Sequence, residues 1–168
     1  MIKNKLSQIW YADLIIALAI FSMVLVLFFT ANPEMGSKEK KILQEMKMES
    51  KVVTGSLLTT GVPVNWNKSN VERIGISDGS RISNSKLTEF AAMNYTQTRS
   101  LLRTHYDYYL FFESSGNIMQ INGSNGIGKP GINQANIEIS DDPDQIVKHS
   151  RIVIYKDTPA KMSLLLWN

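Results

Sequence analysis

The glycine-rich segment 123–129 (GSNGIGK) has the spacing of a phosphate-binding loop, in which backbone amides and a lysine hold phosphate oxygens. That motif continues with a Ser or Thr whose hydroxyl binds Mg²⁺, whereas Pro130 follows here. The preceding apolar run, Ile118–Ile121, is short, and no helix with an apolar face follows the segment. We therefore predict a flexible hairpin loop and expect no nucleotide cofactor.

The acidic segment 141–144 is a second place where chemistry is conceivable. Asp141, Asp142 and Asp144 carry the oxygen ligands that Ca²⁺ prefers. The segment lacks the glycine and the downstream glutamate of a calcium-binding loop, and Pro143 stiffens it. A solvated turn is the better interpretation, so we predict no metal site.

Catalytic chemistry has little support elsewhere in the chain. Cysteine is absent, which excludes thiolate chemistry. His105 and His149 are each isolated from other residues at metal-ligand spacing, and there is no G-x-S-x-G pattern. A Ser-His-Asp triad is defined by geometry and not by chain order, so an enzyme stays open as the weakest hypothesis, with no catalytic residue assigned.

Asp13 is the most unusual residue, because it opens a long apolar stretch. From Leu14 to Ala31 there is no charge, and from Ile9 to Ala31 a helix would be roughly 34 Å long, enough to cross a membrane. Trp10 and Tyr11 lie where aromatic residues anchor a helix at the bilayer surface. A cleaved signal peptide would have a shorter apolar region and a small-x-small cleavage site. We predict a basic leader over 1–8, a transmembrane helix over 9–32, and an outer domain over 33–168.

A carboxylate within a membrane span costs about 2.5–3.5 kcal/mol and usually marks a function. Asp13 either lies one turn inside the span and reaches headgroup water, or it meets a cation. The span holds no Lys or Arg, so such a cation would be an amine at the start of the helix or a residue of another chain. Asp13 therefore points to membrane lipid, and to copies of this chain or related subunits, as partners.

The N-terminal residues resemble those of archaeal type IV pilins and pilin-like proteins. The matching features are Lys3, Lys5, the pair Ser7-Gln8, and Asp13 at the start of the apolar stretch. The resemblance covers about the first 32 residues. It implies that a membrane peptidase cuts between Ser7 and Gln8, that the helix anchors the subunit or bundles in a filament core, and that Asp13 pairs with the new α-amine of a neighbour.

This sequence departs from the family pattern in three ways. A cut before Gln8 makes Asp13 the sixth mature residue where the family has its acidic residue fifth, and a cut before Ile9 restores the position but loses the glutamine. Asp replaces the commoner Glu, and Ser7 replaces the usual Gly or Ala.

Membrane orientation is not settled by lysines, which lie on both sides of the predicted span. Three N-x-S/T tripeptides favour an outer domain because they can accept glycans: Asn67, Asn94 and Asn122. The net charge of +3 is spread over both signs, so we expect no nucleic-acid partner.

The outer segment predicts an α+β domain with a mainly antiparallel sheet and two to three helices. A helix should begin near Ser37 and bury the stripe Ile42, Met46, Val53 and Leu57. Asn84 and Asn94 are expected to cap the next two helices, Ser85–Met93 and Tyr95–Arg103. The predicted strands are Val71–Ile76, Tyr106–Glu113, Ile118–Ile121, Asn136–Ile139, Val147–Tyr155 and Met162–Trp167, the last two forming a hairpin around Lys156–Ala160.

The aromatic strand Tyr106–Glu113 has two different faces. Alternation places Tyr108, Leu110 and Phe112 on a face expected to be core, while Tyr109 and Phe111 on the other face could pack on a helix or bind a partner.

These features favour a pilin-like structural or assembly subunit of the cell surface. In that hypothesis the protein crosses the cell membrane once, with its domain outside, in the membrane or in a filament. The alternative is an unprocessed single-pass protein whose outer domain binds a partner or ligand.

Overall fold

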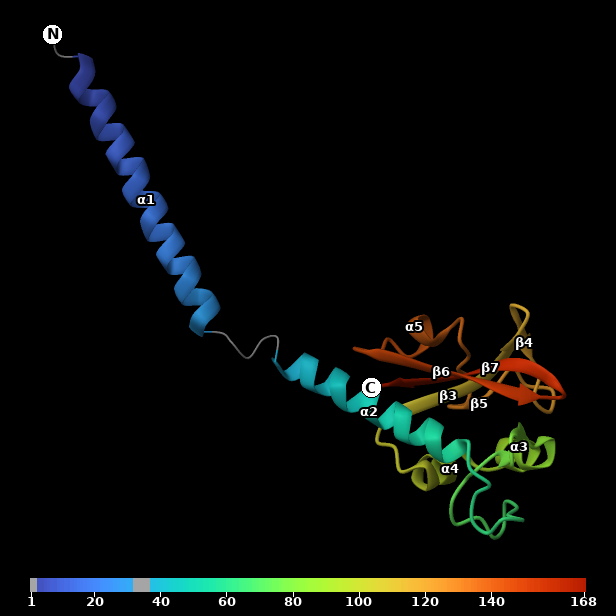
Figure 1. Cartoon of the computed structure of the whole chain (residues 1–168). Helices are drawn as coiled ribbons and strands as arrows, with labels where there is room; N and C mark the ends of the chain where they lie inside the picture. Colours follow the sequence, from blue (N-terminus) through green and yellow to red (C-terminus); the bar gives the residue numbers. More distant parts are fainter. Residues whose placement is uncertain (1–2, 32–36) are drawn as a thin grey trace. The chain divides into compact units, whose positions relative to one another are not determined.

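The computed structural model describes residues 3–31 and 37–168, and the side chains of 11–31, 39–138 and 140–168 among them. The chain divides into two units, 1–42 and 43–168. Helix α1 (Lys3–Ala31) belongs to the first, and α2 (Ser37–Leu57) begins in the first and ends in the second (Figure 1). The remaining elements are β1 (Ser77–Asp78), β2 (Arg81–Ile82), α3 (Asn84–Ala91), α4 (Tyr95–Leu102), β3 (Asp107–Ser114), β4 (Asn117–Met119), β5 (Ile127–Gly128), α5 (Ile137–Ser140), β6 (Ile146–Tyr155) and β7 (Thr158–Trp167).

The N-terminal apolar stretch is helical, as predicted. Its part Tyr11–Ala31 has 21 residues and contains an 18-residue window with a mean hydropathy of 2.8, none of which is buried. A helix of this length and composition can cross a membrane, and an N-terminal signal sequence has the same properties. The predicted end of this helix at residue 32 lies outside the described residues, and the side chain of Ser37 is not among those described.

The second unit is built on a sheet with strand order β1-β2-β6-β7-β3-β4, and β5 also pairs with β3. β7 is central: it pairs antiparallel with β6 over ten residue pairs and with β3 over seven. The α+β class is confirmed. The sheet is mixed and not purely antiparallel, because β2 runs parallel to β6 at the pair Arg81↔Ile154.

The β6–β7 hairpin is confirmed, with a tighter turn than predicted. Lys156 and Asp157 form the turn, both at positive φ (51° and 59°), and β7 already begins at Thr158. Two positive φ values are typical of a type I′ turn, whose twist matches that of the flanking strands. This turn fixes the register of the hairpin from Tyr155↔Thr158 to Ile146↔Trp167.

Both faces of the central strands are covered. Helices α2, α3 and α4 lie on one face of the sheet and α5 on the other (Figure 1). On the first face the buried side chains of β3 and β7 meet those of the helices: Tyr108, Leu110, Phe112, Met162, Leu164, Leu166, Met46, Val53, Leu57, Leu87 and Phe90. On the second face Tyr109, Phe111, Leu165 and Trp167 pack with Ile137 of α5. Of the two roles considered for Tyr109 and Phe111, packing on a helix or binding a partner, the structure shows the first.

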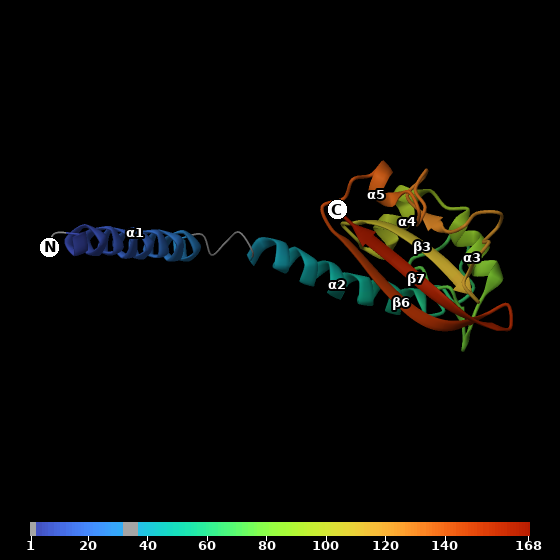
Figure 2. The same cartoon turned by 90° about the horizontal axis from the view of Figure 1, so that it is seen from above.

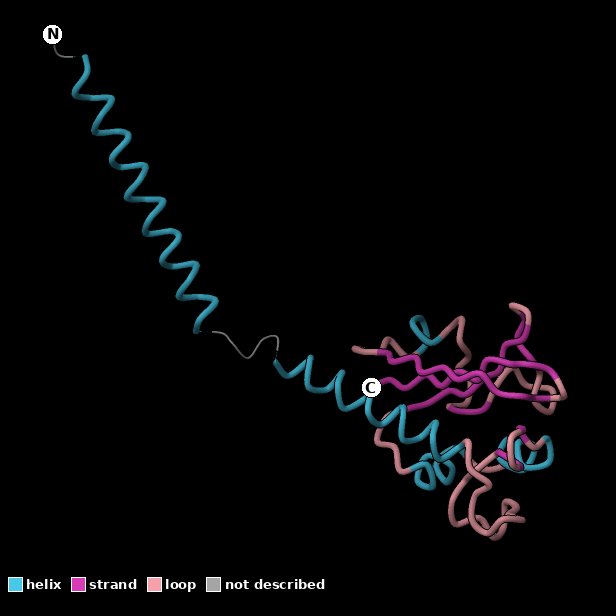
Figure 3. The backbone as a smooth tube through the Cα atoms, viewed as in Figure 1, coloured by secondary structure: helices cyan, strands magenta, loops and turns pink. Residues whose placement is uncertain are grey.

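The predicted strand Val71–Ile76 is wrong. This segment belongs to the long loop after α2 (Figure 3) and makes one isolated bridge, Val62↔Arg73. Its backbone forms hydrogen bonds outside the sheet: the Ile76 N–H donates to the Leu57 carbonyl, at the end of α2, at 2.7 Å. A Cβ on Gly75 would lie 2.2 Å from the Gly61 nitrogen, so two loop segments approach each other closely there.

The predicted strand Asn136–Ile139 is also wrong, because the one-turn helix α5 occupies it. The Asn133 side chain accepts the N–H groups of Ala135 and Asn136, and the Asn136 side chain accepts the Asn133 N–H at 2.6 Å. These side-chain bonds satisfy the backbone in a turn and so compete with a sheet ladder. With α5, the residues from 37 onward hold four helices where two to three were predicted.

One of the two predicted helix caps is confirmed. The Asn94 side chain accepts the Thr96 N–H at 2.9 Å and caps α4. At α3 the capping position is Ser83 and not Asn84. The Asn84 side chain instead accepts a hydrogen bond from the Tyr155 hydroxyl at 3.0 Å and so ties α3 to β6.

Candidate functional site

The first candidate site is α1 itself. Its large apolar side chains are exposed in every direction around the helix, from 41% at Leu25 to 68% at Phe29. The Thr30 hydroxyl donates to the Val26 carbonyl at 2.9 Å, so this polar group is satisfied within the helix. Asp13 is exposed, and it makes no ion pair among the described side chains. A helix that is apolar all round could span a membrane, and an N-terminal signal sequence has the same character.

The predicted cleavage point lies within the same helix, because α1 begins at Lys3 and continues through Ser7 and Gln8 to Ala31. The side chains of Ser7 and Gln8 are not among those described. Cleavage stays a prediction.

The three predicted glycan acceptors are all exposed. The Asn67 side chain accepts the Ser69 N–H at 2.8 Å, Asn94 caps α4, and Asn122 lies in a turn at φ 49°. Their exposure makes them accessible to a modifying enzyme, and glycosylation itself stays a prediction.

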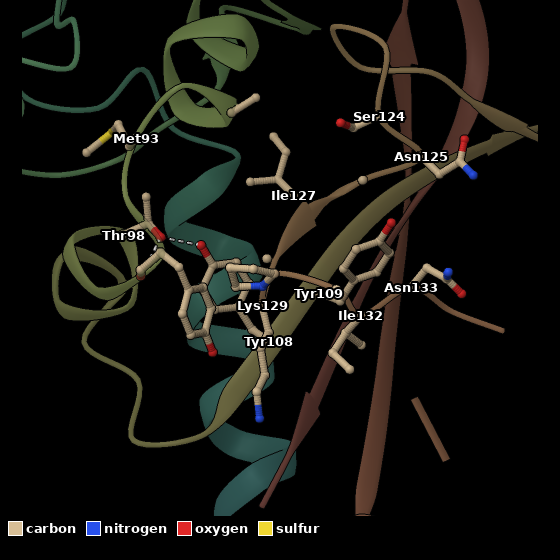
Figure 4. A pocket seen from close by; sticks show the side chains of 16 residues that line it. Met93, Thr98, Tyr108, Tyr109, Ser124, Asn125, Ile127, Lys129, Ile132 and Asn133 are labelled. Carbon is tan, nitrogen blue, oxygen red and sulfur yellow. Dashed lines mark hydrogen bonds between the residues drawn. The ribbon is translucent and has the colours of Figure 1, made fainter. Parts of the chain in front are cut away.

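The second candidate site is a cavity of about 500 Å³ in the outer domain (Figure 4). One wall is aromatic and hydroxyl-bearing, with Tyr95, Thr98, Tyr108 and Tyr109. The other wall is the segment 124–133, which includes most of the glycine-rich motif. The cavity therefore combines aromatic surface with amide and hydroxyl groups, as sites for small polar ligands do.

The glycines of this segment serve close packing. The part Ile127–Gly128 forms β5 and pairs with β3, so the prediction of a purely flexible loop is wrong there. A Cβ on Gly128 would lie 2.1 Å from the Tyr108 carbonyl oxygen, and one on Gly126 would lie 2.5 Å from the Leu110 oxygen. Only glycine lets the segment approach β3 this closely.

Lys129 takes part in an ion network and does not point to a phosphate position. Its ammonium donates to Asp107 and to Asp141, each at 2.7 Å. Figure 4 shows its side chain extending away from Ser124 and Asn125. The glycine-rich motif thus lacks the free lysine that phosphate binding requires.

The two carboxylates of the network have further partners. Asp107 accepts the Tyr95 hydroxyl at 2.7 Å and lies 3.1 Å from the Arg99 guanidinium. Asp141 accepts a hydrogen bond from the indole N–H of Trp167. The prediction of a solvated turn at 141–144 is therefore wrong for Asp141, which joins the loop before β6 to the end of β7.

The charge states in and beside the cavity follow from hydrogen bonds and burial. Hydrogen bonds to Asp107 and Asp141 raise the pKa of Lys129, and the hydrogen bond from Lys129 lowers the pKa of Asp141. Burial raises the pKa of the Tyr95 and Tyr108 hydroxyls. All four groups thus keep their ordinary charge at neutral pH, and the tyrosines act there as hydrogen-bonding groups. Tyr108 donates to the Thr98 hydroxyl at 2.5 Å.

The two histidines have separate environments. The backbone N–H of His105 donates to the Glu49 carboxylate at 3.1 Å. His149 lies on β6, where burial and the positive charges of Arg151 and Lys51 lower its pKa. Among the residues that the structure describes, no three His, Asp or Glu side chains gather into a set that could hold a metal ion.

Comparisons of the chain with protein-family models, curated proteins and solved structures find no match. Function must therefore be argued from the two sites themselves. The sequence did not reveal the Lys129 network or the tyrosine wall, because both join residues that are distant in the chain and carry no local motif.

The Lys129–Asp141 ion pair predicts a pH-dependent contribution to stability. Asp141→Asn should lower the free energy of unfolding by about 1–2 kcal/mol at pH 7. Because the pKa of Asp141 is lowered on folding, the wild-type advantage is complete above the ordinary value of 3.8 and is lost as the pH falls below it. Chemical denaturation of both proteins from pH 7 to pH 2.5, followed by circular dichroism, measures this difference. Asp144→Asn, at an exposed carboxylate, is the control, and an equal loss in both variants would contradict the network's role.

Proposed function

We propose that this protein is a membrane-anchored surface subunit with a pilin-like organisation. In this proposal α1 lies in the cell membrane or in a bundle of like helices, and the α+β domain lies outside the cell. The observation that carries the proposal is the apolar surface of Tyr11–Ala31, which continues around the whole helix. Transfer of a large apolar side chain out of water contributes about 1.5–3 kcal/mol, and the helix presents such side chains on every turn.

Asp13 supports assembly in addition to anchoring. In lipid a lone carboxylate is unfavourable, and a cation that meets it stabilises the arrangement. Within 11–31 there is no Lys or Arg, so the cation has to come from the helix start or from a second chain. An α-amine freed by cleavage near Gln8 would be one such cation, in agreement with the pilin-like N-terminus. We propose copies of this chain, or similar subunits, as the partners that supply it.

A second candidate function has one observation in its favour. The tyrosine-lined cavity of about 500 Å³ is large enough for a small polar ligand. In this alternative the protein keeps its N-terminal residues, α1 is a plain anchor, and the outer domain binds the ligand.

Substitution of Asp13 tests the assembly role. Asp13→Asn keeps the size of the side chain but removes its charge, so it should leave membrane insertion intact and reduce the cross-linked oligomer at least several-fold. Asp13→Glu keeps the charge and should retain most of the assembly. Insertion is measured by resistance to alkaline extraction, and assembly by chemical cross-linking in native membranes. Equal cross-linking in Asp13→Asn and wild type would remove the proposed role.

The N-terminus of the membrane-bound protein separates the two candidate functions. Intact-mass spectrometry of protein purified from native membranes should give a chain that begins at Gln8 or Ile9 if a leader peptidase acts on it. A chain that begins at Met1 or Ile2 would favour the plain anchor with a ligand-binding domain.

A further inference from the structure

Strand β6 has one open edge. It pairs with β7 along its whole length, and on its other side the described residues offer it one pair, Arg81↔Ile154 with β2. Figure 2 shows β6 along the margin of the sheet. The stretch 146–153 therefore presents an unpaired strand edge, which natural proteins usually cover or use for binding.

The type I′ turn fixes which backbone groups point outward. In a two-residue hairpin the residues next to the turn, Tyr155 and Thr158, form a hydrogen-bonded pair, and the hydrogen-bonded pairs alternate from there. The N–H and C=O groups of Lys148, Ser150 and Ile152 consequently face away from β7. By the same alternation the backbone groups of Ile154 also face away from β7, and Ile154 is the residue that pairs with β2. Among residues 3–31 and 37–168, no hydrogen bond reaches the outward backbone groups of these three residues.

The open edge is positively charged. Lys47 and Lys51 of α2 and Arg151 of β6 are exposed, and none of them forms an ion pair with a described carboxylate. The sequence of β6, IVKHSRIVIY, contains no acidic residue. Burial lowers the pKa of His149, and the positive charges of Arg151 and Lys51 lower it further, so both cations lie close to this ring.

The carboxylates of α2 do not neutralise this edge. Glu49 accepts the His105 N–H, and both Glu45 and Glu49 act on Tyr106 at the start of β3. In the part of α2 that belongs to the second unit, Glu45 and Glu49 thus lie towards β3, and Lys47 and Lys51 lie towards β6.

Beneath the edge lies a groove of about 330 Å³ between α2 and β6. Its walls combine Leu43 and Val147 with Lys47, Lys51 and the His149 ring. The Nε2 atom of His149 is buried and has no hydrogen-bond partner among the described residues. On the opposite face of the sheet Ile152 is 76% exposed. A strand added to β6 would place alternate side chains over these two surfaces, one with Lys47, Lys51 and Arg151 and the other with Lys148, Ser150 and Ile152.

We propose that the β6 edge binds an extended acidic segment of another protein by strand addition. The outward groups of Lys148, Ser150 and Ile152 pair with its backbone, and its carboxylates lie over Lys47, Lys51 and Arg151. A second copy of β6 fits poorly, because antiparallel pairing centred on Ser150 would put Arg151 opposite His149 and bring two sets of lysines together. This interaction goes beyond the role of α1 and does not depend on it.

The test uses the full chain in nanodiscs of zwitterionic lipid and a blocked nine-residue peptide of alternating Glu and Val. Fluorescence anisotropy should show saturable binding to the wild type and none for the matched peptide of alternating Lys and Val. Ser150→Pro removes one outward N–H without removing a bond to β7, and should weaken binding at least tenfold. Ser150→Ala is the matched control, because it loses the side-chain bond to Ser163 but keeps the N–H, and should bind within twofold of wild type.

Hydrogen exchange provides a measurement that needs no variant. Peptide binding should slow exchange at the amides of Lys148, Ser150 and Ile152 at least tenfold and leave Val147 and Arg151, which already face β7, unchanged. Absence of binding, unchanged exchange at all three outward amides, or wild-type affinity in a folded Ser150→Pro variant would overturn the proposal. Tighter binding of a peptide with the sequence of residues 146–154 would also overturn it and place a second copy on the edge.

Discussion

The outer domain depends on the pairing of β7 with strands on both sides. β7 is the last strand of the sequence, yet it lies between β3 and β6, and its residues 162–167 are buried. This arrangement covers both faces of the strand: Leu164 and Leu166 face α2, α3 and α4, and Leu165 and Trp167 face α5. Loss of β7 would therefore expose both halves of the core at once.

The position of β7 also determines where the two notable surfaces of the domain lie. Because β7 occupies one edge of β3, the segments β4 and β5 take the other edge, and β5 brings the glycine-rich segment against Tyr109 to form the cavity wall. β7 also occupies one edge of β6, and among the residues that the structure describes the opposite edge is paired at Ile154 alone. The cavity and the open edge are thus consequences of one strand order. Helix α1 obeys a separate constraint, since its apolar surface has no polar side and needs an apolar environment.

Local patterns predicted the parts of the fold that are governed by local physics. Of the four residues of the predicted α2 stripe, Met46, Val53 and Leu57 are buried and Ile42 is half-buried. The aromatic run of β3 forms the predicted strand. The hairpin of β6 and β7 was recognisable because two apolar runs flank a short polar turn. The alternation of aromatic residues in β3 also predicted packing on a helix as one of two roles for Tyr109 and Phe111, and these side chains pack on α5.

The failures arose where distant contacts outweigh local preference. Residues 71–76 have strand-like composition, but their backbone bonds go to the end of α2. Residues 136–139 form a helical turn because the amide side chains of Asn133 and Asn136 satisfy the local backbone. Asp141 looked like a solvated turn residue, yet Lys129 and Trp167, from other segments, both bind it. No spacing rule links such residues, so the candidate site was less predictable than the helices and strands.

In the proposed arrangement α1 lies in the membrane and the domain faces the outside. The absence of native cysteine allows a direct test with two single-cysteine variants. Val24 of α1 and Val52 of α2 have similar exposed fractions, 59% and 67%. Intact cells that carry Val52→Cys or Val24→Cys are treated with a membrane-impermeant maleimide. The account predicts rapid labelling of Val52→Cys and none of Val24→Cys until the protein is denatured in detergent. Labelling of both, or labelling of Val52→Cys only after the cells are broken, would contradict it.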